Sequence, residues 1–158
     1  MRAKSSDICV RAARTEDRQE LARLRAALWP ESSAEKHGRE LVAILAGKAP
    51  GTLPLIELVA LEKGETLVGF AEVGLRSHAD GCDSSRAAGY LEGWYVVESH
   101  RGRGIGRKLL HAAEEWARSH GCVEMASEAL AENEMSQAAH AALGYEVVDR
   151  CVRFRKTL

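Results

Sequence analysis

The sequence lacks an excess of charge of either sign, because its 22 Lys and Arg side chains are balanced by 23 Asp and Glu side chains. Proteins that bind nucleic acid or an anionic membrane surface through their overall field carry a basic excess, so neither partner is expected. No apolar run approaches the roughly 18 residues that span a bilayer, and the basic start has no apolar leader core. We therefore expect a soluble, cytoplasmic protein.

Cysteine is scarce and scattered. The four cysteines, Cys9, Cys82, Cys122 and Cys151, contain no Cys-x-x-Cys pair, so neither a zinc site nor a disulfide framework is predicted. A cysteine nucleophile would need a histidine base, and no motif unites Cys82 or Cys122 with His140. We expect reduced thiols and no metal.

The chain is long enough for one domain with a substantial core, since 46% of its 158 residues are hydrophobic. We predict a single domain over residues 1–158. The spacing of apolar residues and turn formers predicts a succession of strands and helices. In order, these are a strand at Ile8 and Val10, helices from Thr15 to Pro30 and from Ser33 to Ala46, a loop from Gly47 to Pro54, strands at 55–61 and 66–75, a loop at 78–86, a strand at 90–97, a helix from Ile105 to about Gly121, a strand at 122–126, a helix at 133–143, and strands at 145–148 and 152–155.

This order combines antiparallel hairpins with a strand-helix-strand crossover, which is typical of an α+β domain. We expect a three-layer α/β/α fold around a central mixed, mostly antiparallel β-sheet.

The most informative stretch is a predicted strand followed by a turn that contains Gly102, Gly104 and Gly106 and then by a helix. Glycines let backbone N–H groups approach an anion, and the start of a helix adds a partial positive charge. Four basic residues add formal charge: Arg101, Arg103, Arg107 and Lys108. A tight turn beside a solvated basic face is the alternative. The P-loop and dinucleotide-binding motifs are both absent.

Arg101-x-x-Gly104-x-Gly106 after an apolar strand resembles the pyrophosphate-binding signature of the GNAT superfamily of acetyl-CoA-dependent N-acetyltransferases. The resemblance extends to Asn133 and its small helix, to Leu143-Gly144-Tyr145, and to the order of elements. It implies the GNAT-like three-layer fold and acetyl-CoA as cosubstrate.

Within that superfamily, the chain most closely resembles the aminoglycoside 6'-N-acetyltransferases. Four segments carry this resemblance: Leu28-Trp29-Pro30, residues 81–85, Leu91-Glu92-Gly93, and residues 124–127 leading to 132–137. The resemblance implies direct acetyl transfer to the 6'-amine of an aminoglycoside, resistance to these antibiotics, and a homodimer.

Residue by residue, the resemblance implies that the backbone of Trp94, Tyr95 and Val96 pairs with pantetheine. A main-chain N–H near Val96 would polarise the thioester carbonyl. Asn133 would also contact coenzyme A. The pyrophosphate would be held by Gly102, Arg103, Gly104, Ile105, Gly106 and Arg107.

An aminoglycoside carries several ammonium groups, so its site needs carboxylates. Glu92 is the predicted catalytic acid-base and ammonium-binding residue, and a partly exposed strand glutamate is the alternative. Trp29 is predicted to be a wall for the sugar ring, although a core position would also explain it. Further substrate contacts are predicted for His78, Glu128 and Asp149.

His140 stands where many GNAT enzymes have the tyrosine that protonates the departing thiolate. It is our candidate acid, with a helix-surface histidine as the alternative. Tyr145 is offset from the usual place, and water is a further proton source. Glu72 is a second carboxylate with no motif behind it.

Two other functions fit the same motifs. One is acetylation of a different amine, such as a polyamine, an amino acid or a protein N-terminus. The other is a non-catalytic module that binds acetyl-CoA or an amine.

Overall fold

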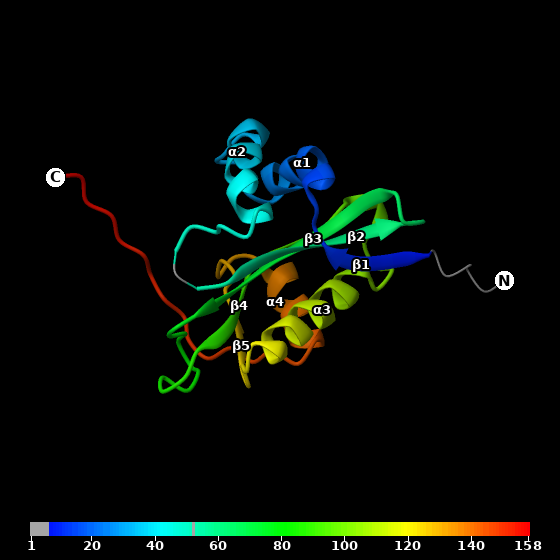
Figure 1. Cartoon of the computed structure of the whole chain (residues 1–158). Coiled ribbons are helices and arrows are strands. Elements are labelled where there is room, and N and C mark those ends of the chain that lie inside the picture. Colours follow the sequence, from blue (N-terminus) through cyan, green and yellow to red (C-terminus); the bar gives the residue numbers. More distant parts are fainter. Residues whose placement is uncertain (1–6, 52) are drawn as a thin grey trace.

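The structure is a computed structural model that describes residues 7–51 and 53–158 (Figure 1). The first six residues of the predicted domain, which begin the stretch without a leader core, lie outside the described residues, as does residue 52 in the predicted loop from Gly47 to Pro54. None of the helices in the described part of the chain is long and apolar enough to cross a membrane.

The strands form one sheet in the order β1-β2-β3-β4-β5. Strands β1 to β4 are antiparallel neighbours, whereas β5 pairs in parallel with β4. The predicted mixed, mostly antiparallel sheet is therefore confirmed. The strands are β1 (Ile8–Ala12), β2 (Leu55–Glu62), β3 (Thr66–Arg76), β4 (Ala88–Val96) and β5 (Met125–Ser127).

Helices cover both faces of the sheet, so the predicted three layers are present. Figure 1 shows α1 and α2 on one face and α3 with α4 on the other. The helices are α1 (Arg18–Leu28), α2 (Ala34–Leu45), α3 (Ile105–Ser119) and α4 (Glu134–Ala142), with short 3-10 turns η1 (Thr15–Asp17) and η2 (Glu98–His100). Helix α2 begins where predicted, because the Ser33 side chain accepts a hydrogen bond from the Lys36 N–H and so satisfies a free backbone donor.

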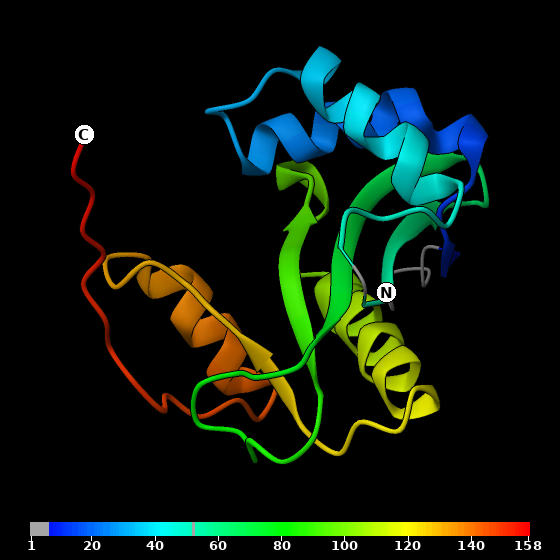
Figure 2. The ribbon, with the colours of Figure 1, turned by 60° about the vertical axis from the view of Figure 1, so that its left-hand side comes forward.

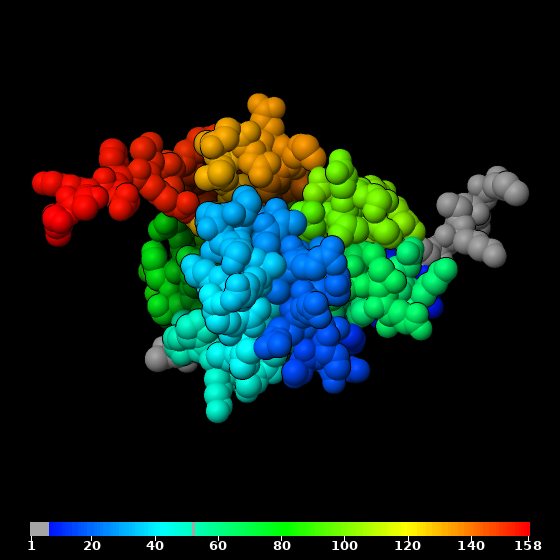
Figure 3. All heavy atoms as spheres, turned by 90° about the horizontal axis from the view of Figure 1, so that it is seen from above, coloured from blue at the N-terminus to red at the C-terminus, as the bar shows by residue number. Residues whose placement is uncertain are grey.

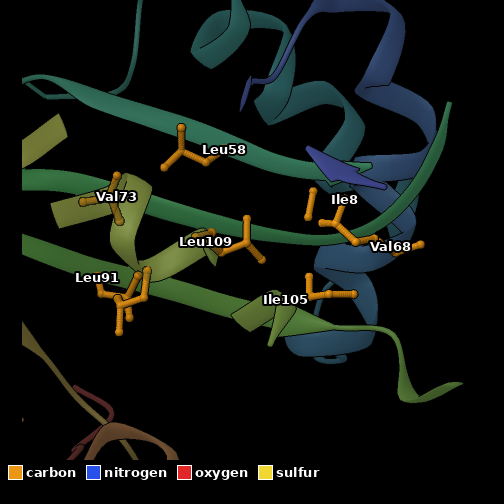
Figure 4. Close-up of a cluster of buried hydrophobic side chains, with 11 residues drawn as sticks. Ile8, Leu58, Val68, Val73, Leu91, Ile105 and Leu109 are labelled. Carbon is orange, nitrogen blue, oxygen red and sulfur yellow. The ribbon is translucent and has the colours of Figure 1, made fainter. Parts of the chain in front are cut away.

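Successive residues of a strand point to opposite faces, and this alternation creates a core on each side of the sheet. On the α3 side, Ile105 and Leu109 pack against residues of β2 to β4, including Leu58 and Leu91 (Figure 4). On the α1 and α2 side, a second cluster is centred on Phe70, which is completely buried.

The predicted strands at 145–148 and 152–155 are wrong. Residues 145–158 contain neither helix nor strand and run outwards from the body, as the red ribbon in Figure 2 shows. Figure 3 shows the end of this segment projecting beyond the rest of the surface. The β-type apolar residues that suggested strands are present but exposed, and a strand cannot form without a neighbour to accept its backbone hydrogen bonds.

Candidate active site

Strand β4 carries the predicted site, and an extra residue interrupts its pairing at Glu92. Glu72 of β3 lies opposite Gly93, whereas the next residue, Val73, lies opposite Leu91. Glu92 therefore has no partner on β3. A bulge of this kind bends the strand and redirects a side chain, which explains why an acid interrupts an otherwise apolar strand.

The same strand parts from β5 at this point. Pairing between β4 and β5 ends at Leu91 and Ser127, so residues 93–96 of β4 are paired only with β3. The Val97 N–H donates to the Val68 carbonyl on the β3 side at 3.0 Å. Because neighbouring residues of a strand direct their backbone groups to opposite edges, the N–H groups of Trp94 and Val96 face the open edge. An extended ligand that contains amides can pair there.

The glycine loop lies next to this open edge. Gly102 and Gly104 have φ angles of 73° and 78°, and a Cβ added to either would meet no described atom within 4 Å. Gly104 is also the N-cap of α3. The N–H groups of the first helical turn have no partner within the helix, and no side chain at Gly104 blocks the approach of an anion to them. Gly106 has a different role, since a Cβ there would lie 2.8 Å from the Trp94 ring.

Basic side chains partly anchor this loop. Arg103 and His100 contact the Glu62 carboxylate at 3.0 and 3.3 Å, and their hydrogen bonds lower the pKa of Glu62. Arg101 donates from Nε to the Val96 carbonyl at 2.9 Å, which ties the loop to the end of β4. Arg107 lies exposed on the first turn of α3.

These features fit the phosphates and the amide arm of acetyl-CoA. The glycine loop offers open backbone for the pyrophosphate, and the edge of β4 offers backbone partners for pantetheine. The indole N–H of Trp94 is buried without an acceptor among the described residues. Asn133 caps α4, since its Oδ1 accepts from the Ser136 N–H at 3.0 Å, and its predicted contact with coenzyme A stays a prediction.

On the other side of Glu92, Trp29 packs between the core cluster around Phe70 and β4, and its role as a wall for the sugar ring stays a prediction. A Cβ added to Gly93 would lie 2.4 Å from the Trp29 indole, so the ring rests directly on the backbone beside Glu92. A shallow cavity of about 250 Å³ also opens beside Glu92 and is lined mainly by residues of the loop before β2 and by Gly74 and Leu75.

Arg76 and Tyr90 belong to this site and were not predicted. Arg76 donates to both oxygens of the Glu92 carboxylate, at 2.9 and 2.7 Å, and its guanidinium lies 3.4 Å from the centre of the Tyr90 ring. Burial raises the pKa of Tyr90, and the nearby charges of Glu128 and Glu92 raise it further. The sequence shows no motif around Arg76. Only one signal pointed to such a residue: a half-buried carboxylate such as Glu92 needs a cationic partner.

The two other predicted acids, Glu128 and Asp149, lie at different distances from Glu92. Glu128 lies close enough to act electrostatically on Arg76 and Tyr90, and it forms an ion pair with Arg153 of the C-terminal segment. Asp149 is exposed in that same segment, with its carboxylate accepting from the Arg150 N–H.

His78 is exposed in the loop that follows β3, with Nε2 3.4 Å from Asp80. In this arrangement, therefore, Glu128 lies beside the Glu92 group, whereas Asp149 and His78 make other contacts.

His140 is held firmly at the end of β5. Its Nδ1 lies 2.7 Å from the Ser136 carbonyl, so Nδ1 carries a proton, and its Nε2 lies 2.9 Å from the Ser127 hydroxyl. The imidazole packs edge-on between Trp94 and Tyr145, each 5.5 Å away between ring centres. Nε2 is thus the atom that could exchange a proton.

Tyr145 is unsuited to an acid role in this arrangement. Its hydroxyl is buried without a partner among the described residues, and burial, followed by the charge of Glu114, raises the pKa of Tyr145. No group of three or more His, Cys, Asp or Glu side chains that could hold a metal is found in residues 7–51 and 53–158.

A strand with one open edge, ending at a glycine-lined helix start, fits an acyltransferase that uses coenzyme A. Residues 18–145 match the acetyltransferase (GNAT) family, and the chain belongs to this family. It is 40% identical to the "Aminoglycoside N(6')-acetyltransferase type 1" of Klebsiella aerogenes, over 94% of this chain and 96% of the relative. The enzyme of the same name from Stenotrophomonas maltophilia is 43% identical, over 94% of this chain and 93% of the relative.

Solved structures agree with these relatives. AAC(6')-Iy in complex with the bisubstrate analogue CoA-S-monomethyl-acetylneamine is 34% identical, with a TM-score of 0.85 over 97% of this chain and all of that one. Its complex with CoA superposes with a TM-score of 0.86, at 32% identity over the full length of both chains.

Proposed function

We propose that this chain is an aminoglycoside 6'-N-acetyltransferase that transfers the acetyl group of acetyl-CoA directly to the 6'-amine and thereby confers resistance. The observation that carries the proposal is the position of Glu92 on the β4 bulge, between the Trp29 wall and the open edge that fits acetyl-CoA. Donor and acceptor would therefore meet along a few residues of one strand. We place the reaction in the cytoplasm, where acetyl-CoA is available.

The chemistry of the acceptor explains why an acid is needed. The 6'-amine arrives as an ammonium ion and must lose a proton before it attacks the thioester. A carboxylate has about four lone-pair positions, and Arg76 uses two of those of Glu92, so the remaining ones can hold the ammonium. Glu128 adds negative charge nearby. Desolvation beneath Trp29 would lower the pKa of the amine, and water or Glu92 would take its proton.

The acetyl group would be activated by the backbone of β4. The Val96 N–H, which faces the open edge, would polarise the thioester carbonyl as the amine attacks. The amine nitrogen, which becomes positively charged as it attacks, loses a second proton to water, and the tetrahedral intermediate expels the coenzyme A thiolate, which takes a proton from Nε2 of a His140 imidazolium or from water. No acetyl-enzyme is formed.

The first experiment determines the acceptor and the position of the acetyl group. The purified protein is incubated with acetyl-CoA and with kanamycin, tobramycin, a 6'-hydroxyl aminoglycoside or spermidine, and thiol release is followed. We expect turnover of kanamycin and tobramycin, with NMR placing the acetyl on the 6' nitrogen. Turnover of the 6'-hydroxyl compound, or of spermidine alone, would contradict the proposal.

The second experiment tests Glu92. Because one of several acids holds the ammonium, Glu92→Gln should raise the aminoglycoside KM about tenfold and lower kcat several-fold, so that kcat/KM falls more than kcat. Glu65→Gln, at an exposed position of the β2–β3 turn, is the matched control. Unchanged constants in Glu92→Gln between pH 6 and 9 would remove this residue from the site.

We also propose that the protein is a homodimer in which the C-terminal segments, residues 145–158, are exchanged. Val152 and Phe154 of this segment are 77% and 92% exposed, and β5 lies at the end of the sheet with only β4 as its neighbour among the described residues. An unpaired edge and an apolar segment that alternates with charged residues are complementary when two copies meet. Asp149 of one copy would then be brought to the other copy.

Sedimentation measures this directly. The wild-type protein should sediment as a dimer, and Phe154→Asp should shift it to the monomer while leaving its far-UV circular dichroism unchanged. A wild-type monomer at micromolar concentration, or a dimer unaffected by Phe154→Asp, would contradict exchange of this segment.

A further inference from the structure

A buried cluster of ionisable side chains lies between α1 and the sheet, outside the groups that the proposed mechanism uses. Arg25 of α1 is only 6% exposed, and its Nη1 donates to the carboxylates of both Glu57 on β2 and Glu72 on β3. These glutamates are directly opposed in the β2–β3 register, and Glu57 is 2% exposed. Burying three ionisable groups is costly, so the cluster calls for an explanation.

The cluster contains more acidic than basic side chains. Two carboxylates share one guanidinium, and the nearby Glu40 at the rim, 3.6 Å from Arg25, adds a third acid. Burial raises the pKa of Glu57 well above its usual range, and a hydrogen bond with Glu72 raises it further. Both effects favour the protonated form of Glu57, in which its side chain adds no second negative charge beside Arg25.

Arg25 also holds Trp29. Its guanidinium carbon lies 4.9 Å from the centre of the Trp29 ring. The buried His37 links the two residues, since Arg25 Nε donates to Nδ1 at 3.4 Å and Nε2 lies 3.4 Å from the Trp29 carbonyl. Trp29 is the C-cap of α1, and its N–H donates to the Arg25 carbonyl at 2.8 Å, so the backbones of the two residues are joined as well. The indole itself packs against Arg25, against the His37 ring at 6.0 Å between centres and against Phe70 at 5.9 Å.

The cluster reaches the candidate active site through the sheet. Glu57 lies opposite Glu72, and Glu72 lies opposite Gly93, so one row of residues crosses β2, β3 and β4. The Trp29 ring rests on Gly93 at the end of this row, next to the bulged Glu92.

We propose that Arg25, clamped between Glu57 and Glu72, is a positioning residue that holds Trp29 against Gly93 and so sets the shape of the acceptor site beside Glu92. The proposal rests on the proposed function. Arg25 touches no substrate. It acts through Trp29, so its loss should affect the binding of the acceptor and spare that of acetyl-CoA.

Substitution of Arg25 tests this separation. Arg25→Met keeps the length of the side chain and removes the charge, and we expect the aminoglycoside KM to rise about tenfold. The KM of acetyl-CoA and the kcat should stay within about twofold. Arg25→Lys, which keeps the charge, should recover part of the loss. An equal deterioration of both KM values and kcat would indicate a general structural role and overturn the proposal.

A double-mutant comparison tests the route through Trp29. If Arg25 acts only by holding the indole, Arg25→Met should raise the aminoglycoside KM less than twofold further in a Trp29→Ala background. A full tenfold increase in that background would show that Arg25 acts independently, which contradicts the proposal.

The two glutamates keep the test valid if Arg25→Met does not fold. Glu57→Gln resembles the protonated form that burial favours and should leave the aminoglycoside KM within twofold, whereas Glu72→Gln removes a carboxylate that accepts from Arg25 and should raise it several-fold. Equal effects of the two substitutions would contradict the assigned roles. Control Glu40→Gln, at the half-exposed rim, should have little effect.

The pH dependence of stability provides a readout that is independent of activity. A raised pKa in the folded state means that stability is fully present below the unfolded value of 4.5 and is lost as pH rises through the folded pKa. Glu57→Gln abolishes this loss, so its Tm relative to wild type should increase as pH rises above about 5. A Tm difference that does not change with pH would contradict the raised pKa of Glu57. If the wild-type protein acetylated no aminoglycoside, the proposed function would fail while this result stood.

Discussion

Two regions of this molecule are packed very differently, although both belong to one sheet. Every residue that is buried in the described chain lies between Ile8 and Cys122, and residues 123–158 contain none. The first region has a helix layer on each side of four paired strands. The second consists of the three-residue β5, helix α4 and an extended segment. The difference shows that packing density follows the number of helix layers and paired strands, because the C-terminal region has only a three-residue strand and one short helix.

The largest expected effect contrasts two phenylalanines. Phe70→Ala removes a completely buried side chain and should lower the free energy of unfolding by about 3–5 kcal/mol. Phe154→Ala, at a position 92% exposed, should change the unfolding of the isolated monomer by less than about 0.5 kcal/mol. Urea unfolding at low protein concentration measures both, and similar losses would break the contrast between the regions.

The second prediction asks whether the loosely packed region takes part in catalysis. If His140 protonates the leaving thiolate, His140→Ala should lower kcat about 10²-fold with little change in either KM. His111→Ala, at an exposed position of α3, is the control. Steady-state kinetics measure this. Equal kcat values for the two variants would show that His140 contributes only packing.

The third and smallest effect compares the two ends of α3 within the well-packed region. Gly104 and Gly121 have φ angles of 78° and 82°, and an added Cβ meets no described atom within 4 Å at either. Alanine should therefore cost a similar 1–2 kcal/mol of backbone strain at each position. Gly104→Ala alone should weaken acetyl-CoA binding, by about tenfold, in calorimetry. Equal acetyl-CoA affinities of the Gly104→Ala and Gly121→Ala variants would contradict the prediction that this loop binds the pyrophosphate.

The order of elements up to Leu143 could be predicted from the sequence because it depends on local periodicity. The apolar stripe that includes Ile105 and Leu109 has the spacing of a helix whatever it packs against. The segment with Val152 and Phe154 alternates like a strand, but pairing depends on a distant neighbour that a local pattern cannot identify. That is why the last two strands were predicted wrongly.

The candidate site divides in a similar way. Glu92 and the glycine loop lie in contiguous motifs, so they could be predicted from the sequence. Arg76 comes to Glu92 from the neighbouring strand, through the pairing of β3 with β4, and Arg25 reaches Glu57 from a helix 32 residues away along the chain. Such contacts depend on register and on helix docking, and neither can be derived from one sequence.

The bulge at Glu92 has a consequence for the response of this protein to selection. A regular β4, one residue shorter, would complete its ladder with β3 and would lose the carboxylate that we assign to the acceptor. Laboratory evolution for heat resistance alone would therefore favour deletions at this position, whereas exposure to antibiotic would eliminate them. At this bulge, selection for thermal stability and selection for acetyl transfer therefore favour opposite changes.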